Sequence, residues 1–283
     1  MLNLSKNNRI SKIIISTICG HSGLGIFPYI LFPTFWIFML TAWKTKTLII
    51  AKSATRYKWT GNFVLHKPKT WRFVHKIKDK KSILNAFGMT NPGAVIYAIM
   101  LKITLLLGFN VIPSLFAVFP RGYKKGLEEN IEAIHIFKKI LGKHFWALEL
   151  VPSCPNSGED IFDNQYWILE LCKRAKKEFP YTVIIVKGSV IYPGNFYTHL
   201  EEAGIDIIHT INTIPFDKAV GLGISPYQFS PFGEKTKGGY SGEIIKLTAL
   251  NYAKNTTIPS TKNRLIFGGG VSDESDMVKY MKV

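Results

Sequence analysis

The chain has 283 residues, of which 47% are hydrophobic and 19% are charged. This composition excludes disorder for most of the sequence, because disordered chains are poor in apolar residues, and it indicates a packed globular protein. The 36 lysines and arginines against 19 acidic residues give a formal charge of +17, which attracts phosphates, nucleic acid or anionic membranes without marking a site.

The cysteines Cys19, Cys154 and Cys172 show no C-x-x-C spacing. The sequence therefore predicts no disulfide framework, no iron–sulfur cluster and no metal site, and a reducing compartment fits best. Residues 1–12 are basic but lack the apolar core and cleavage site of a secretory signal, so we expect a cytoplasmic protein.

Residues 25–43 form an uncharged, almost wholly apolar segment that approaches the length of a membrane span. Pro28 and Pro33 interrupt its first half, which leaves residues 34–43 for a helix. We expect a core or interface helix there, ahead of a membrane-surface helix and, last, a true span. Membrane contact is therefore not expected.

Short β-branched apolar runs alternate with patterns of helical period along the rest of the chain. The expected helices are clearest at residues 126–141 and 164–178. The expected strands are residues 11–19, 47–53, 110–119, 145–151, 182–188, 205–213 and 264–270. Such alternation predicts a parallel sheet, and the lack of an early G-x-G-x-x-G favours a (β/α)8 TIM barrel over an open sheet. Only a short helix follows the seventh run, so the eighth strand is expected to be missing from this chain.

Polar or glycine-rich motifs stand at the expected strand ends, where barrel enzymes place their chemistry. In chain order they are His21-Ser22-Gly23, Lys52-Ser53-Ala54-Thr55 with Gly61-Asn62, Asn85 to Asn91, Ser153-Cys154-Pro155-Asn156, Lys187, Ile211-Asn212-Thr213, Gly238 to Gly242, and Gly269-Gly270. Taken together and in order, these motifs resemble those of the dihydroorotate dehydrogenase family of the cysteine-base type (class 1), over nearly the whole chain. The resemblance implies one TIM-barrel domain over residues 1–283, C-terminally incomplete.

The resemblance implies FMN-dependent oxidation of dihydroorotate to orotate in pyrimidine biosynthesis, with a hydride passing to flavin N5 and a proton passing to Cys154 as the base. A thiol with an ordinary pKa of about 8.5 can accept a proton as thiolate. The implied substrate-binding residues are Lys52, Asn85, Phe87, Gly88, Met89, Asn156, Asn212 and Thr213. The implied cofactor-binding residues are Ser22, Gly23, Lys52, Ser53, Lys187, Gly238, Gly239, Ser241, Gly242, Gly269 and Gly270. The helix beginning near Ser272 is expected to point its positive end at the phosphate.

Two features depart from the family pattern. Val151 stands where the family usually has an asparagine, so one amide contact to flavin or substrate is lost. The second half of the phosphate site is expected after Val283, which makes weak FMN binding or dependence on a partner an expected property of this chain.

The resemblance leaves the electron acceptor open between fumarate and NAD, the latter through a partner subunit with FAD and an iron–sulfur cluster, and a homodimer is also compatible. Two other functions stay open. A tRNA dihydrouridine synthase would use a similar flavin barrel and cysteine and would give the charge of +17 a role in RNA binding. A non-catalytic barrel subunit would bind no flavin. No nucleic-acid partner is expected, because no separate RNA-binding tail follows the barrel.

Overall fold

The structure is a computed structural model that describes residues 13–26, 29–64, 66–78, 80–152, 161–192, 194–255 and 264–282. The chain divides into two compact units. The first comprises Met1–Trp59, Asn91–Val151 and Arg174–Ile184, and the second comprises Thr60–Thr90, Pro152–Lys173 and Ile185–Val283. The single domain expected over residues 1–283 stays a prediction.

The first unit is built on parallel strands. β1 (Ile14–Ser16), β2 (Leu48–Ile50) and β5 (Val111–Ile112) form a sheet with β2 in the centre, and β6 (Ser114–Phe116) pairs in parallel with β7 (Ala147–Val151). Strands β2, β5, β6 and β7 are buried along their whole length, as parallel strands covered on both faces are. The first four predicted strands are thereby confirmed.

The predicted strand 110–119 is divided in two by Pro113. Proline has no N–H to donate to a ladder, so β5 ends before it and β6 begins after it. The Pro113 carbonyl accepts a hydrogen bond from Glu149 N–H at 3.0 Å, which ties the break to β7.

Three α-helices belong wholly to the first unit: α1 (Pro33–Lys44), α2 (Ala94–Leu106) and α3 (Tyr123–Leu141). Helix α3 contains the predicted helix 126–141 and packs against α2. Short 3-10 helices lie at Tyr29–Leu31 and Gly142–His144. The helix expected at residues 34–43 is confirmed as α1, but it is not a core helix, because only Phe35, Met39 and Ala42 are buried in it. Within the described residues no helix is long and apolar enough to cross a membrane.

The chain passes from the first unit into the second within β8 (Val183–Lys187). In the second unit β8 pairs in parallel with β9 (Ile207–Thr210), which pairs in parallel with β12 (Arg264–Phe267). Helix α4 (Ile161–Glu178) precedes β8 and contains the predicted helix 164–178. The other helices are α5 (Gly194–Glu202), α6 (Phe216–Gly221), α7 (Lys246–Asn255) and α8 (Glu274–Met281).

The second unit also contains an antiparallel sheet that the sequence analysis did not predict. Its order is β10 (Ile214–Pro215), β11 (Gly239–Gly242), β4 (Ser82–Asn85) and β3 (Val74–Ile77). Two further 3-10 helices, Pro68–Phe73 and Glu243–Ile245, lie beside it in the chain. Leu84, Ile214, Phe216 and Tyr240 are fully or almost fully buried in its core.

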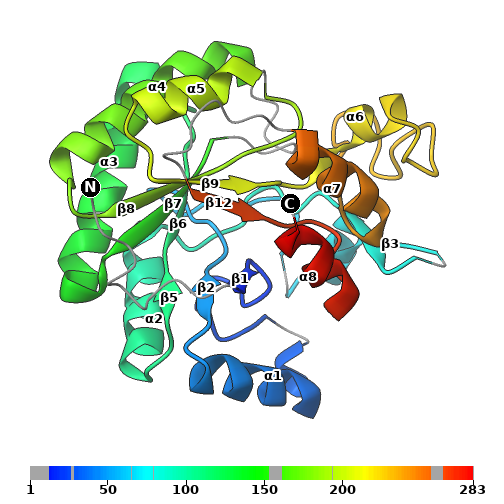
Figure 1. Cartoon of the computed structure of the whole chain (residues 1–283), viewed down its shortest axis with the longest axis horizontal. Coiled ribbons are helices and arrows are strands. Elements are labelled where there is room, and N and C mark those ends of the chain that lie inside the picture. The colour runs from blue at the N-terminus through cyan, green and yellow to red at the C-terminus, as the bar shows by residue number, and fades with distance from the viewer. Residues whose placement is uncertain are drawn as a thin grey trace. The chain divides into compact units, whose positions relative to one another are not determined.

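The repeated order of strand, helix and parallel strand along the chain is that of a TIM-barrel-like α/β fold, as predicted (Figure 1). The last described strand is β12. The absence of an eighth barrel strand from this chain stays a prediction.

Candidate active site

The predicted site residues that the structure describes lie at or just beyond the carboxyl ends of strands, or on the antiparallel sheet. Ser22, Gly23, Lys52 and Ser53 belong to the first unit. The second unit holds Asn85, Phe87, Gly88, Met89, Lys187, Asn212, Thr213, Gly238, Gly239, Ser241, Gly242, Gly269 and Gly270. Cys154 and Asn156 lie outside the described residues. The two groups are therefore described separately.

A chain of polar side chains leads from the carboxyl end of β2 into the core of the first unit. The hydroxyls of Ser53 and Ser114 are 2.8 Å apart, and Ser114 Oγ donates to Glu149 Oε2 at 2.6 Å. Ser114 N–H donates to Tyr97 OH at 2.8 Å. Glu149 is fully buried, and burial of a carboxylate is costly unless hydrogen bonds compensate. These hydrogen bonds fix the position of the Ser53 side chain, which the motif resemblance assigns to cofactor binding.

His21 lies beside Lys52 and has an incomplete set of hydrogen bonds. Burial, followed by the positive charge of Lys52, lowers the pKa of His21 to about 3, against a smaller opposing effect of a hydrogen bond with the Ser53 backbone. The imidazole is therefore neutral at physiological pH. Its Nε2 atom is buried and has no hydrogen-bond partner in the described part of the chain. A buried, unpaired ring nitrogen of this kind is available to a ligand.

The Ser22-Gly23 turn is held by its own backbone. Ser22 Oγ accepts from Leu24 N–H at 3.1 Å, and the Ser22 carbonyl accepts from Thr104 Oγ at 2.6 Å. Gly23 has φ +77°, and a Cβ there would lie 3.0 Å from Val111 Cγ2. The turn thus needs glycine and packs closely against β5.

Thr55 and Asn91, which end two of the motifs, bind each other rather than line the site. Asn91 Oδ1 accepts from the backbone N–H groups of Thr55 and Gly93, and Asn91 Nδ2 donates to Thr55 Oγ1 at 3.0 Å. Both side chains are buried. Their role is to join the loop after β2 to the start of α2.

In the second unit, Asn85 lies at the end of β4 beside two of the predicted glycines. Asn85 Nδ2 donates to the Gly239 carbonyl at 3.3 Å. A Cβ on Gly238, whose φ is +83°, would lie 2.8 Å from the Asn85 carbonyl oxygen. These two glycines therefore pack against Asn85, which the resemblance assigns to substrate, and the expectation that they approach the flavin phosphate is not supported by this contact.

The loop after Asn85 has an unusual backbone. Gly88 and Met89 are consecutive residues with φ values of +66° and +64°. A non-glycine residue at positive φ is strained, and such strain is common at functional sites. A Cβ on Gly61 would lie 2.2 Å from the Gly88 carbonyl oxygen, and the Phe63 and Phe87 rings lie 4.6 Å apart. These contacts hold the loop in place.

Lys187 is the last residue of β8, and its exposed fraction is only 9%. It lies opposite His209 in the register of β8 and β9. No carboxylate or other hydrogen-bond acceptor among the described residues binds its ammonium group. A lysine with a largely buried side chain at the carboxyl end of a strand is well placed to bind an anionic group of a ligand.

Asn212 and Thr213 follow β9 on the same edge of the parallel sheet as Lys187. The Asn212 N–H donates to the Gly188 carbonyl at 2.9 Å, and Asn212 Oδ1 accepts from Thr213 N–H at 2.9 Å. The first bond places Asn212 directly beside the end of β8. The structure therefore brings Lys187 and Asn212 together, as their motifs predict.

The loop after β12 has backbone donors without acceptors. Neither Gly269 N–H nor Gly270 N–H donates to an acceptor within the described residues. Gly270 has φ +69°, and a Cβ there would lie 2.8 Å from the Gly242 carbonyl oxygen. Gly242 and Gly270 therefore form one close approach, and consecutive N–H groups at such a turn suit a phosphate. Ser241, half-buried, lies in β11 just before Gly242.

The start of α8 is capped by acidic side chains of the protein itself. Asp273 accepts from Asp276 N–H at 3.0 Å, and Asp276 accepts from Ser272 N–H at 3.0 Å. Lys246 Nζ lies 2.7 Å from Asp276 Oδ2, and this contact holds the pKa of the Asp276 carboxyl well below its usual range. One N–H group of the first helical turn, that of Asp276, is thus occupied by an acid of the protein, as is the N–H group of Ser272 before the helix. The expectation that this helix end points at the phosphate stays a prediction.

Two of the three cysteines are inert. Cys19 and Cys172 are free and buried, and burial raises the pKa of their thiols to about 11 and about 12. They are protonated at neutral pH and are poor bases. Among the described residues no cluster of three His, Cys, Asp or Glu side chains is placed to hold a metal ion.

Sequence reasoning missed three features of the site. His21 could have been noticed in the sequence, because the family motif that His21-Ser22-Gly23 resembles has alanine at this position. Glu149 and the Lys246–Asp276 pair carried none, because their roles depend on partners distant in sequence. The buried Val151, by contrast, is as apolar in the structure as in the sequence and offers no amide.

Comparison with known proteins shows which family the chain is similar to. The family model for dihydroorotate dehydrogenase matches residues 39–283. Three similar relatives are each named catalytic subunit of dihydroorotate dehydrogenase B (NAD(+)). Those of Thermotoga petrophila and Thermotoga maritima are 26% identical over 211 residues, which is 71% of this chain and 68% of theirs. That of Malacoplasma penetrans is 26% identical over 239 residues, 82% of this chain and 70% of its own.

The family match spans most of the chain, and it includes β2, β7, β8, β9 and β12 with Lys187 and the Gly269-Gly270 turn. The chain therefore belongs to the dihydroorotate dehydrogenase family of oxidoreductases.

Proposed function

We propose that this chain binds FMN and oxidises dihydroorotate to orotate in pyrimidine biosynthesis, with Cys154 as the base. The observation that carries the proposal is Lys187, whose side chain is only 9% exposed at the carboxyl end of β8 and has no anionic partner among the described residues. A buried cation of this kind is stabilised only when an anion or a strong acceptor joins it. The electron-rich edge of a flavin is such a partner.

The residues of the second unit fit FMN at two points. Lys187, beside Asn212, would face the flavin ring, where a positive charge stabilises the reduced anionic form. Gly269 and Gly270 would bind the phosphate through backbone N–H groups that have no acceptor in the described residues. Gly242 supports this turn from β11.

The first unit supplies further groups for the cofactor and substrate. Ser53 is held by Ser114 and Glu149, so its hydroxyl has a defined position. Lys52 and the unpaired Nε2 of neutral His21 lie at the same strand end. We propose that His21 donates or accepts one hydrogen bond to the bound cofactor, a contact that the alanine of the family motif does not make.

The chemistry divides between the cofactor and the protein. When bound, FMN supplies a two-electron acceptor for the hydride that leaves C6 of dihydroorotate. Cys154 removes the proton from C5, while the amides of Asn85, Asn156 and Asn212 orient the carboxylate and ring of the substrate. The buried, protonated state of Cys19 and Cys172 leaves Cys154 as the cysteine suited to this role.

Electrons must then leave the reduced protein. The relatives named above are catalytic subunits of an NAD(+)-linked enzyme, which favours NAD over fumarate as the acceptor here. We propose an electron-transfer partner subunit with FAD and an iron–sulfur cluster, and a cytoplasmic location. The family assignment favours dihydroorotate over tRNA dihydrouridine as the substrate.

The test is anaerobic titration of the FMN-reconstituted chain with dihydroorotate, followed by flavin absorbance. We expect bleaching of the oxidised flavin band and formation of one orotate per flavin. A chain that binds FMN but is not bleached would refute the proposed substrate, and a chain that binds no FMN at any concentration would support a non-catalytic subunit instead.

A further inference from the structure

The outer faces of helices α1 and α2 are exposed and apolar. On α1 the exposed apolar side chains are Trp36, Ile37, Phe38, Leu40 and Trp43, and on α2 with its C-cap they are Val95, Ile96, Ile99, Ile103, Leu106 and Leu107. We call this set the α1–α2 face. The buried stripe of α2 (Ala94, Tyr97, Ala98, Leu101 and Thr104) accounts for the other side of that helix.

Helix α3 of the same unit shows what a solvated outer face looks like in this chain. Its exposed positions are mainly charged, including Lys124, Lys125, Glu128, Glu132 and Lys138. Glu128 pairs with Arg174, and Glu132 pairs with Arg56. An apolar outer face is therefore a property of α1 and α2 and not of outer helices in general. Exposed apolar side chains gathered on one helix face often mark a binding surface.

The two helices approach each other at their C-terminal ends. Trp43 Nε1 donates to the Leu107 carbonyl at 2.9 Å, and Lys46 Nζ donates to the Gly108 carbonyl at 2.9 Å. Lys46 Nζ also lies 4.7 Å from the centre of the Trp43 ring. Both helices belong to the first unit and are drawn in blue and blue-green in Figure 1.

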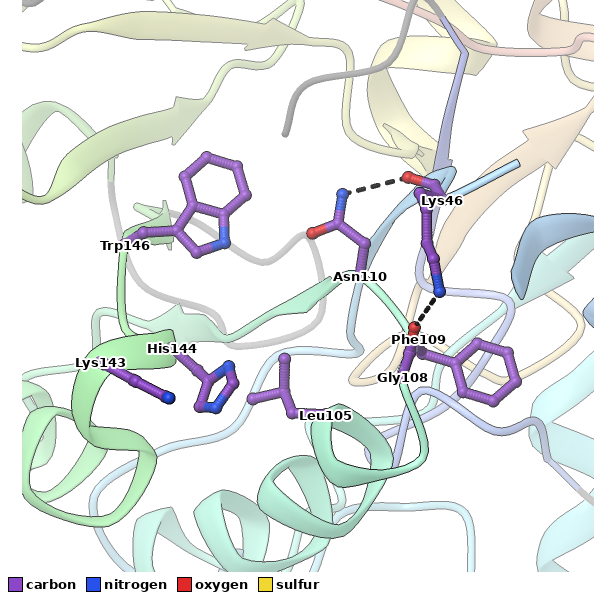
Figure 2. Close-up of a pocket in the computed structure, with 8 residues that line it drawn as sticks. All are labelled: Lys46, Leu105, Gly108, Phe109, Asn110, Lys143, His144 and Trp146. Carbon is purple, nitrogen blue, oxygen red and sulfur yellow. Dashed lines mark hydrogen bonds between the residues drawn. The ribbon is translucent and has the colours of Figure 1, made fainter. Parts of the chain in front are cut away.

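An open pocket of about 520 Å³ borders this surface where the helices meet. Leu105, Phe109 and Trp146 give it apolar walls, and Lys46, Lys143 and His144 give it nitrogen-bearing side chains. Figure 2 shows Lys46 and Lys143 on opposite sides of the pocket in that view. The lysines that line the pocket suit a lipid phosphate group, and its apolar side chains suit the acyl chain joined to that phosphate.

The charge around the face has one sign. Helices α1 and α2 contain two lysines, Lys44 and Lys102, and no aspartate or glutamate. Lys44, Lys46 and Lys143 are exposed at the C-terminal margin of the face. Such a surface is complementary to an anionic bilayer, which attracts clustered lysines within a Debye length.

We propose that the α1–α2 face docks this protein on an anionic phospholipid membrane. The apolar side chains enter the interfacial layer, where tryptophans such as Trp36 and Trp43 are favoured, and Lys46 and Lys143 bind a lipid phosphate. The helices lie on the membrane without crossing it.

The position of the pocket supports this orientation. Lys46, Asn110 and Trp146 precede β2, β5 and β7, so the pocket lies at the amino ends of these strands. Ser53, at the carboxyl end of β2, lies at the other end of the strand. A docked face at the amino ends leaves the site residues of this unit open to substrate.

A second copy of the chain fits the face less well. A two-fold contact places the same patch of each copy against the other, which brings the lysines of one margin close to those of its partner. Since α1 and α2 have no acidic residue, such a contact has no carboxylate from these helices to offset the repulsion.

The experiment is flotation of the full chain with vesicles of phosphatidylcholine alone or with about 30% phosphatidylglycerol, at low and high salt. We expect binding to the anionic vesicles at least tenfold tighter than to phosphatidylcholine, and weakened by salt. The double variant Ile99→Glu with Ile103→Glu, and separately Lys44→Glu with Lys143→Glu, should each weaken binding at least tenfold.

Two control variants match these changes in charge. Tyr181→Glu with Phe229→Glu alters two side chains that are 86% and 83% exposed elsewhere, and Lys138→Glu with Lys139→Glu reverses two exposed lysines on α3. Both should bind within twofold of the unaltered chain, with circular dichroism verifying the fold of every variant. Equal binding to both vesicle types, or an unaffected Ile99 and Ile103 variant, overturns the proposal. A soluble dimer that this variant dissociates, without vesicle binding, overturns it in favour of a contact between copies.

Discussion

Replacement of Lys187 by methionine should have opposite effects on two quantities, the stability of the flavin-free protein and its affinity for FMN. Methionine keeps most of the side-chain length and removes the charge, so the packing at the end of β8 changes little. In the protein without flavin, the change removes the ammonium of a side chain that is only 9% exposed and has no acceptor in the described residues. A buried unsatisfied polar group costs about 1 to 3 kcal/mol, so the flavin-free variant should be more stable by about that amount.

The same substitution should weaken flavin binding. A hydrogen bond to a charged group contributes about 1.5 to 3 kcal/mol, which corresponds to a rise in the FMN dissociation constant of about 10- to 150-fold. For a chain of this size, 1 kcal/mol shifts the melting temperature by about 2 °C. We therefore expect the flavin-free variant to melt about 2 to 6 °C higher, and the flavin-saturated variant to lose most of the stabilisation that FMN gives.

The assay is differential scanning calorimetry of each protein with and without FMN, together with titration of flavin fluorescence. Lys218→Met, which removes an exposed lysine on α6 of the same unit, is the matched control and should change neither quantity. A Lys187→Met protein that melts lower without flavin and binds FMN normally would show that Lys187 has a structural partner and no cofactor role.

The other predictions concern the proposed base Cys154, the imidazole of His21 and the carboxylate of Asp276. Cys154→Ser should keep bound flavin but slow its reduction by dihydroorotate about 100-fold or more at neutral pH, as stopped-flow absorbance would reveal. The pKa of His21 in the folded protein is lowered to about 3, so the free energy of unfolding falls as pH drops below the ordinary histidine value of about 6.5. Between pH 7.5 and 5, urea unfolding should show that the unaltered protein loses about 2 kcal/mol more of this free energy than the His21→Gln variant does. Parallel losses in both proteins would contradict this. Because the pKa of Asp276 is lowered from 3.8, Asp276→Asn should destabilise the fold above that pH, and the difference should shrink as pH falls below it. A difference in urea midpoint that is independent of pH would refute the role of the carboxylate charge.

The parallel strands were predictable because each is a short β-branched run that is buried along its length. The sequence placed one strand over residues 110–119, and Pro113 explains why the structure divides it. The antiparallel sheet was not predictable by the same route. β11 is Gly-Tyr-Ser-Gly and pairs with β4, over 150 residues earlier, so neither its composition nor its neighbours in sequence indicate a strand.

The site was predictable where one motif supplies a complete feature. Lys187 ends its strand and Asn212 follows the next one, so their proximity follows from parallel pairing. The role of the glycines was predictable only in part, since Gly238 packs on Asn85 while Gly242 packs on Gly270. Those contacts depend on the antiparallel sheet, which the sequence did not predict.

Helix α1 shows why composition predicts burial poorly at the surface of a barrel. An apolar helix of 12 residues was expected to lie in a core or an interface, yet the fold buries one stripe of three side chains and exposes most of the rest. Hydropathy measures how much apolar surface a helix carries, whereas the diameter of the helix limits how much of it one sheet can cover. Helix α2 repeats the pattern, with one buried stripe and an exposed apolar face. Helix α3 shows that an outer helix of this protein can carry a charged face. The exposed apolar faces of α1 and α2 are unfavourable in water, and docking on a membrane surface would remove them from water.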